Sequence, residues 1–156
     1  MGTEIERKYL VAGDAWRELA EPVAYRQGYL SAEPTCTVRV RVAGERGYLT
    51  VKSKPVGAVR REFEYEIPVA DAEQLFGLCR QPLIEKTRRR IPHGDLVWEV
   101  DEFLGANAGL VVAECELAAE DQVVVEPPWV GREVTGDERY YNSSLAERPF
   151  TTWDAD

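Results

Sequence analysis

The sequence is poor in the residues that build the most common metal and redox sites. Its 156 residues include only three cysteines and one histidine. Cys36, Cys79 and Cys115 are widely spaced and form no Cys-x-x-Cys pair, so the pattern predicts reduced, mostly buried thiols and neither a zinc site nor a disulfide framework. His93 lies in a Pro-His-Gly segment typical of a turn, which favours an exposed side chain over a catalytic one.

Excess positive charge and long apolar runs are also absent. The formal net charge of −9 disfavours nonspecific binding to nucleic acid, so any bound polyanion must meet a local basic site. No run approaches the ~20 apolar residues of a membrane span, and the N-terminus lacks the apolar stretch of a secretory signal. We therefore expect a cytoplasmic protein without a membrane partner. A glycine-rich phosphate loop of the Walker type is missing as well.

The composition that remains is that of an ordinary folded domain with extra charge. A hydrophobic content of 44% argues against disorder, and a chain of this length buries roughly two thirds of its unfolded surface on folding. No linker, internal repeat or low-complexity stretch divides the sequence, so we expect one domain over residues 1–156. Charged residues make up 30%, which is more than an average domain carries.

Short alternating segments rich in β-branched and aromatic residues predict an α+β fold that is mainly β. The eight expected strands are Glu4–Val11, Tyr25–Leu30, Thr37–Ala43, Gly47–Lys54, Val59–Pro68, Leu83–Ile91, Leu96–Leu104 and Leu110–Leu117. Hairpin-like spacing favours an eight-stranded antiparallel barrel, with a sandwich as the alternative. The expected flanking helices are Asp14–Leu19, Asp71–Cys79 with Asp71 as N-cap, part of Ala118–Val125, and a C-terminal helix over Asp137–Ala146.

Charges on these strands sort by sign in an unusual way. Residues two apart share one face of a strand, about 6.5 to 7 Å apart. The charged sets so defined are Glu4, Glu6 and Lys8; Arg39 and Arg41; Lys52 and Lys54; Glu62, Glu64 and Glu66; Lys86, Arg88 and Arg90; Glu99 and Asp101; Glu114 and Glu116. For any single strand a solvated face explains the pattern. Like charges about 7 Å apart, however, repel by roughly 2.4 kcal/mol at an effective dielectric near 20, so the repetition indicates a compensating ligand.

Acidic strands beside basic strands would form a site with two chemically different halves. Carboxylate oxygens suit hard cations such as Mg²⁺ or Mn²⁺, whereas arginine and lysine suit phosphate oxygens. A metal-bridged polyphosphate satisfies both halves.

These residues resemble the triphosphate tunnel metalloenzymes, also called the CYTH superfamily. Glu4-Ile-Glu6-Arg-Lys8 looks like the Glu-x-Glu-x-Lys signature of that family. Further stretches resemble the family strands in the expected order: 26–30 (RQGYL), 38–41 (VRVR), 50–54 (TVKSK), 62–64 (EFE), 85–88 (EKTR), 99–101 (EVD) and 114–116 (ECE). The ending, from the Pro-Pro-Trp of 127–129 to the Arg-Tyr-Tyr-Asn of 139–142, is similar to that of short bacterial members.

The resemblance implies a fold, a metal and roles for individual residues. It implies an eight-stranded antiparallel tunnel acting on triphosphate compounds with a divalent metal, Mg²⁺ or Mn²⁺. Metal binding carries over to Glu4, Glu6, Asp101, Glu114 and Glu116, with Glu4 and Glu6 catalytic, and triphosphate binding to Lys8, Arg39, Arg41, Lys52, Lys86 and Arg88. Glu62 and Glu64 match further tunnel acids, in metal binding or water positioning. Arg139, Tyr140 and Asn142 fall where a family helix can close one tunnel mouth, with a plain surface helix as the alternative, and a homodimer is a family-based expectation.

The intact Glu-x-Glu-x-Lys resembles inorganic triphosphatases, which cut tripolyphosphate to pyrophosphate and phosphate. We therefore expect direct attack by water, with a glutamate such as Glu6 helping to deprotonate it. A nucleoside or thiamine triphosphatase and an adenylyl cyclase of the same family are the alternatives. A non-catalytic polyphosphate-binding module is the rival from another class.

Overall fold

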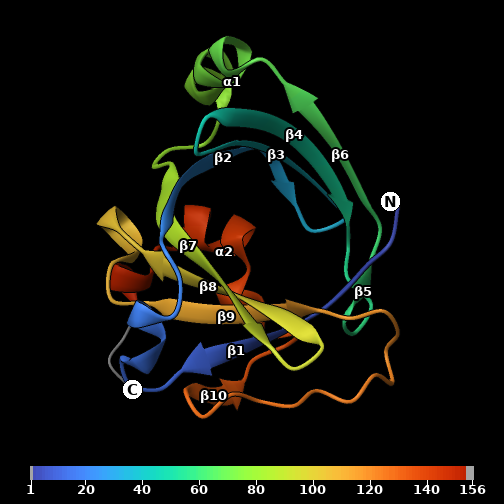
Figure 1. The fold of residues 1–156 in the computed structure, drawn as a ribbon. Coiled ribbons are helices and arrows are strands. Elements are labelled where there is room, and N and C mark those ends of the chain that lie inside the picture. The colour runs from blue at the N-terminus through green and yellow to red at the C-terminus, as the bar shows by residue number, and fades with distance from the viewer. Residues whose placement is uncertain (1, 154–156) are drawn as a thin grey trace.

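The computed structural model describes residues 2–153, in which ten strands form one curved antiparallel sheet (Figure 1). The strands are β1 (Glu4–Val11), β2 (Val23–Glu33), β3 (Cys36–Ala43), β4 (Arg46–Ser53), β5 (Val59–Arg60), β6 (Glu62–Ile67), β7 (Ile84–His93), β8 (Leu96–Phe103), β9 (Val111–Glu116) and β10 (Val130–Glu133). The helices are short: α1 (Val69–Leu75), α2 (Asn142–Glu147) and 3₁₀ turns at Ala15–Glu18, Phe76–Leu78, Gly105–Asn107, Glu138–Tyr140 and Phe150–Thr152. The expected antiparallel, mainly β fold is confirmed.

The sheet curls until its two ends approach each other. Neighbouring strands follow the order β10-β1-β9-β8-β7-β2-β3-β4-β6, and β5 pairs with β1 off this path. Glu4 lies opposite Arg60 and Ile5 opposite Val59, while only Arg61 separates β5 from β6 (Figure 1). Within residues 2–153 the path itself ends at β6 and β10, so the sheet is one curved layer bridged by β5 rather than the two layers of a sandwich.

The expected number of eight strands is wrong. The predicted strand Val59–Pro68 is divided at Arg61 into β5 and β6, because the chain turns from β1 toward β4 at that residue. The four residues of β10 follow Pro127 and Pro128 and pair with β1 at Tyr9 and Val11. So short a strand carries too few residues for its alternation to be recognised.

Helix predictions fared less well than strand predictions. Asp14–Leu19 contains only the 3₁₀ turn, and α1 begins at Val69 directly after Pro68, so Asp71 lies in its first turn and is not the N-cap. No helix forms in Ala118–Val125, where the chain makes a turn and then runs extended. Asp137–Ala146 is interrupted at Tyr141, whose extended backbone separates the 3₁₀ turn from α2.

The inner face of the sheet changes character along the strands. On β7, Ile84 packs in an apolar cluster with Leu145 of α2, whereas Lys86 and Arg88, two and four residues further along the same face, are buried and charged. The α2 helix therefore covers an apolar end of the interior, and the charged part lies beyond it. Outside the sheet, α1 packs on the valines of β3, and a second cluster forms around Trp98.

Two further expectations concern cysteines and membranes. Cys36, Cys79 and Cys115 are free thiols; the last two are buried, but Cys36 is exposed. None of the helices in the described part of the chain is long and apolar enough to cross a membrane.

Candidate functional site

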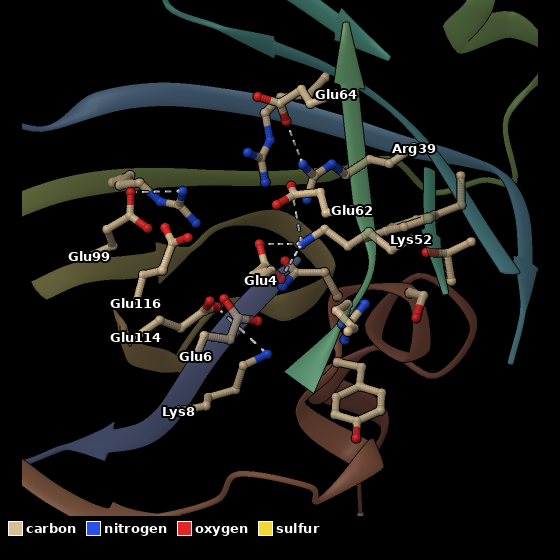
Figure 2. A pocket seen from close by; sticks show the side chains of 18 residues that line it. Glu4, Glu6, Lys8, Arg39, Lys52, Glu62, Glu64, Glu99, Glu114 and Glu116 are labelled. Atoms are coloured by element: carbon tan, nitrogen blue, oxygen red, sulfur yellow. Dashed lines mark hydrogen bonds and ion pairs between the residues drawn. The ribbon is translucent and has the colours of Figure 1, made fainter. Parts of the chain in front are cut away.

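A cavity of about 220 Å³ lies inside the curve of the sheet and is lined mainly by charged side chains (Figure 2). Eleven of the thirteen site residues predicted from the sequence line it: Glu4, Glu6, Lys8, Arg39, Arg41, Lys52, Glu62, Glu64, Arg88, Glu114 and Glu116. Lys86 and Asp101 are the two that do not. The alternation of charge along the strands therefore identified the interior correctly.

Strand register gathers the acids on one side of this cavity. On β1 and β9, Glu6 lies opposite Glu116 and Lys8 opposite Glu114, so two acidic faces meet edge to edge (Figure 2). Burial, together with the neighbouring charges of Glu114 and Glu4, raises the pKa of Glu6 to about 8. The crowding of carboxyl groups makes this wall receptive to a cation.

Other carboxyl groups of the wall differ in their partners. Burial would raise the pKa of Glu114, but the charge of Lys8, 3.7 Å away, and a hydrogen bond from Glu6 hold it well below its usual range. For Glu116, burial and the charges of Glu4 and Glu99 raise the pKa. The acids of this wall therefore do not carry equal proton affinity.

Glu4 forms an ion pair with a lysine from β4, a strand toward the other end of the sheet. The Lys52 ammonium donates to both Glu4 carboxylate oxygens, at 3.0 and 3.2 Å, and lies 3.7 Å from Glu62 (Figure 2). Burial nevertheless raises the Glu4 pKa, because the lysine offsets only part of the desolvation and Glu62 adds a like charge. A cation that binds Glu4 must therefore compete with Lys52.

The basic wall is formed by β3 and β7. Arg39 and Arg41 project from β3 and Arg88 from β7, and all three are at most 9% exposed. Burial lowers the pKa of Arg41 to about 9, and the charges of Arg39 and Arg88 contribute to the shift. Three buried guanidinium groups around one cavity repel each other, and an anion placed between them would relieve that repulsion.

Arg39 is only partly satisfied by its neighbours. Its Nη2 donates to Thr50 Oγ1 at 3.2 Å and to Glu64 Oε2 at 3.4 Å. Its Nε is buried and has no hydrogen-bond partner within the described residues. Since buried polar groups are nearly always paired, this N–H is a candidate to donate to a ligand oxygen.

Lys86 and Asp101 form an ion pair behind the cavity wall. Asp101 Oδ1 accepts from Arg88 Nε at 2.8 Å, and Asp101 Oδ2 accepts from Arg88 Nη2 at 2.9 Å. Lys86 Nζ lies 2.8 Å from the same Oδ2. Burial would raise the pKa of Asp101, but the Arg88 and Lys86 charges overcome it and lower the pKa to about 2. Both carboxylate oxygens are thus engaged by cations of the protein itself.

The cavity also has seven lining residues outside those thirteen, of which the sequence had named only Glu99, in a charged strand face, and Asn142, at a tunnel mouth. They are Tyr29, Thr37, Arg60, Glu99, Tyr141, Asn142 and Ser143. Glu99 shares a strand face with Asp101, so alternation alone was a usable signal. Arg60 enters through β5, which the sequence predicted only as part of one longer strand. Residues 141–143 enter through the fold of the C-terminal segment, for which no sequence pattern gives the direction. Arg139, by contrast, is exposed and paired with Asp137.

The acidic wall offers donors of one chemical type. Carboxylate oxygens are the ligands preferred by Mg²⁺ and Mn²⁺, and burial together with neighbouring carboxylates raises the pKa values of Glu4 and Glu6, so a divalent ion would favour their ionised forms. Among residues 2–153, no group of three or more His, Cys, Asp or Glu side chains is arranged to hold a metal ion by itself. The wall therefore fits a metal by donor type and charge, with other ligands completing the coordination.

Comparisons with known proteins agree with this geometry. The CYTH domain family matches residues 2–149. An inorganic triphosphatase of Acetivibrio thermocellus is 52% identical over 151 residues, which cover 96% of this chain and 97% of that protein. An inorganic triphosphatase of Nitrosomonas europaea is 42% identical over 150 residues, 92% of this chain and 97% of that protein. A crystal structure of an inorganic triphosphatase superimposes with a TM-score of 0.67 at 38% identity, covering 94% of this chain and 95% of the other.

Proposed function

The chain belongs to the CYTH family, and we propose on that basis that it is an inorganic triphosphatase, which hydrolyses tripolyphosphate to pyrophosphate and phosphate. The observation that carries the proposal is the single cavity with guanidinium groups on one wall and carboxyl groups on the other. Its volume of about 220 Å³ is below the roughly 300 to 1,000 Å³ typical of pockets for drug-sized ligands. A small, densely charged anion suits such a space.

The proposed enzyme is one domain over residues 1–156 whose sheet acts as a tunnel. The β5–β1 pairing completes the tunnel wall where β6 and β1 do not pair directly. Homodimerisation and a cytoplasmic location stay predictions.

Arg39, Arg41 and Arg88 bind the triphosphate. Guanidinium groups donate paired, charge-assisted hydrogen bonds to phosphate oxygens, and the three project into one space from two strands. Lys8 and Lys52 lie on the acidic side and neutralise phosphate oxygens that approach the carboxylates. Lys86 acts from behind the wall, since its ammonium is buried against Asp101.

Mg²⁺ or Mn²⁺ would be held by Glu4, Glu6, Glu114 and Glu116. Magnesium commonly uses one or two carboxylates and completes its coordination with phosphate oxygens and water, which fits the lack of a preformed three-carboxylate group among the described residues. Asp101 is left out of this set because Arg88 and Lys86 occupy its oxygens. When bound, the metal withdraws charge from phosphate oxygens and lowers the pKa of a coordinated water.

Hydrolysis proceeds by attack of water, without a covalent enzyme intermediate. Ionised Glu6 takes the proton of the attacking water at a carboxylate oxygen. The arginines stabilise charge on the phosphate being cleaved, and the buried walls keep their geometry as that charge develops. Glu62 and Glu64 orient Lys52 and Arg39 through their ion pairs.

A second candidate substrate is a nucleoside triphosphate. A second cavity of about 360 Å³ adjoins the first and shares Thr37, Arg60, Tyr141 and Ser143 with it. An organic group attached to the triphosphate would lie there, against Tyr141.

The test is phosphate release from tripolyphosphate, ATP and thiamine triphosphate, each with Mg²⁺, with Mn²⁺ and with a chelator. Metal-dependent release from tripolyphosphate well above the other two substrates is the expected result. A preference for ATP would transfer the assignment to the second candidate. Binding of tripolyphosphate without release under any metal would refute the enzyme and leave a polyphosphate-binding module.

A further inference from the structure

A layer of buried polar side chains lies directly behind the basic wall. Gln27 is 0% exposed, and Lys86 and Asp101 are 1% exposed each, and none of the three lines the cavity. We refer to these three residues as the buried polar layer. Groups of this kind are costly to bury unless their hydrogen bonds are complete, so their partners indicate what they hold in place.

Asn142, the first residue of α2, is the point at which this layer joins the C-terminal segment. Its Oδ1 accepts from Lys86 Nζ at 3.1 Å and from Gln27 Nε2 at 3.3 Å. A lysine ammonium has no acceptor, so the Asn142 atom facing it must be the oxygen. Arg41 Nε likewise can only donate to Gln27 Oε1, at 3.0 Å, which turns Gln27 Nε2 toward Asn142. The donor and the acceptor of each of these three hydrogen bonds are therefore fixed by chemistry.

Two arms run from Asn142 and end on cations of the cavity wall. The shorter arm passes through Gln27 to Arg41. The longer arm passes through Lys86 and Asp101 to Arg88. Both terminal guanidinium groups line the cavity, although they come from different strands. One side-chain oxygen thus supports two arginines of the basic wall.

An uncharged acceptor suits this position better than a carboxylate. A carboxylate at 142 would hold the same donors but would cancel positive charge that the cavity needs for an anion. The segment carrying Asn142 is also well anchored, because Leu145 and Ala146 of α2 are 0% and 4% exposed in the apolar cluster with Tyr29 and Ile84. Packing of α2 therefore sets the position of the Asn142 oxygen.

We propose that Asn142 is a positioning residue for triphosphate binding, which links the docking of α2 to the placement of Arg41 and Arg88. The proposal rests on the proposed function only in its choice of ligand. Because coupling between two sites is reciprocal, an anion that fixes the arginines also stabilises α2.

A double-mutant cycle on metal-free binding of tripolyphosphate tests the link through Gln27. Asn142→Ala removes the acceptor, and Gln27→Met removes the relay at nearly constant volume without changing charge. Gln27→Met, which breaks the shorter arm, should raise the Kd about tenfold. Asn142→Ala, which breaks both arms, should raise the Kd more, and the double variant should bind no worse than Asn142→Ala alone. Ser144→Ala, on the same helix but with no side-chain bond to the layer, should leave the Kd unchanged. A further rise of about tenfold when Gln27→Met is added to Asn142→Ala, or an equal loss in Ser144→Ala, would overturn the proposal.

Hydrogen exchange of α2 supplies a second measurement that does not depend on the Asn142 variant folding. The amides of Leu145 and Arg148 donate to the Tyr141 and Ser144 carbonyl oxygens and report the integrity of the helix. Tripolyphosphate, added with chelator, should slow their exchange in the unmodified chain several-fold more than in Gln27→Met. Equal protection in both proteins contradicts the link. A chain that binds tripolyphosphate but never hydrolyses it refutes the triphosphatase alone, and a chain that hydrolyses it without coupling refutes only the role of Asn142.

Discussion

Asp101→Asn should destabilise the protein more than any change to its surface charges. Asp101 is 1% exposed and accepts from Arg88 at 2.8 and 2.9 Å and from Lys86 at 2.8 Å. Asparagine keeps the shape, but it removes the negative charge and turns an NH₂ group toward two cations. Breaking a buried ion pair by removing one partner typically costs about 3–5 kcal/mol, because the remaining charge is left uncompensated. We expect a loss of that size.

The same interaction makes the stability contributed by Asp101 dependent on pH. The native pKa of about 2 lies below the ordinary value of 3.8, since the two cations outweigh burial. At about 1.4 kcal/mol per pKa unit, ionised Asp101 contributes on the order of 2 kcal/mol. Because the native pKa is the lower one, this stability is present above pH 4 and is lost as the pH falls toward 2. Asp101→Asn should lack this acid-dependent part.

Denaturant unfolding at pH 7 in the presence of chelator measures the effect, with thermal unfolding beside it. A change of 3–5 kcal/mol corresponds to a Tm lower by roughly 6–20 °C for a domain of this size. Glu66→Gln is the control, since its pair with Arg46 is 56–69% exposed and worth at most about 1 kcal/mol. A loss below about 1 kcal/mol for Asp101→Asn, or one that appears only with metal, would refute the stabilising role of the Asp101 ion pair. Asp101 would then return to the set of expected metal ligands.

Three more predictions concern the cavity. Glu4→Gln and Glu6→Gln should each abolish metal-dependent phosphate release while circular dichroism stays unchanged. The control is Glu66→Gln, whose side chain is exposed and does not line the cavity, and full activity in both variants would refute their catalytic role. Arg39→Ala should raise the KM for tripolyphosphate at least tenfold, and unaltered kinetics would remove Arg39 from the site. The raised pKa of Glu6, about 8 against 4.5, contributes stability below pH 4.5 that is lost as pH rises through 8. With chelator, Tm should therefore fall between pH 5 and pH 8.5, less so in Glu6→Gln, and a pH-independent difference between the two proteins would contradict the shift.

Strand alternation predicted the interior well because its period is a property of the backbone. Any strand with one face inward places residues two apart on that face, so Arg39 and Arg41, or Glu114 and Glu116, reach the cavity whatever the neighbouring strand is. The matched residues of the family signature fell on the same faces. Strand positions were therefore predictable from one sequence.

Depth along a strand was not predictable in the same way. Lys86 and Arg88 share a face of β7, yet only Arg88 lines the cavity, because α2 packs over Ile84 at one end of the strand. Alternation names the face of a residue but not the element that covers it. The contacts of Asn142 with Lys86 and Gln27 were not predictable for the same reason, because the sequence indicates a closing helix without indicating which way its first side chain points.

The strand β1 pairs with β9 and β10 in the main sheet and with β5 off it, and this position has a consequence for the order of folding. β1 is made first during synthesis, but its neighbours β9 and β10 come from the last third of the chain, and the backbone N–H of Lys8 donates to the hydroxyl of Thr135, 127 residues away. Contacts of such long sequence separation form slowly and only after the whole chain is available. The strands β2, β3 and β4 can pair locally as hairpins, whereas β1, which carries Glu4 and Glu6, can pair with β9 only after β9 has been made. We therefore expect the acidic wall to assemble after the hairpins, and a chain that ends before β9 to lack the Glu114 and Glu116 half of that wall.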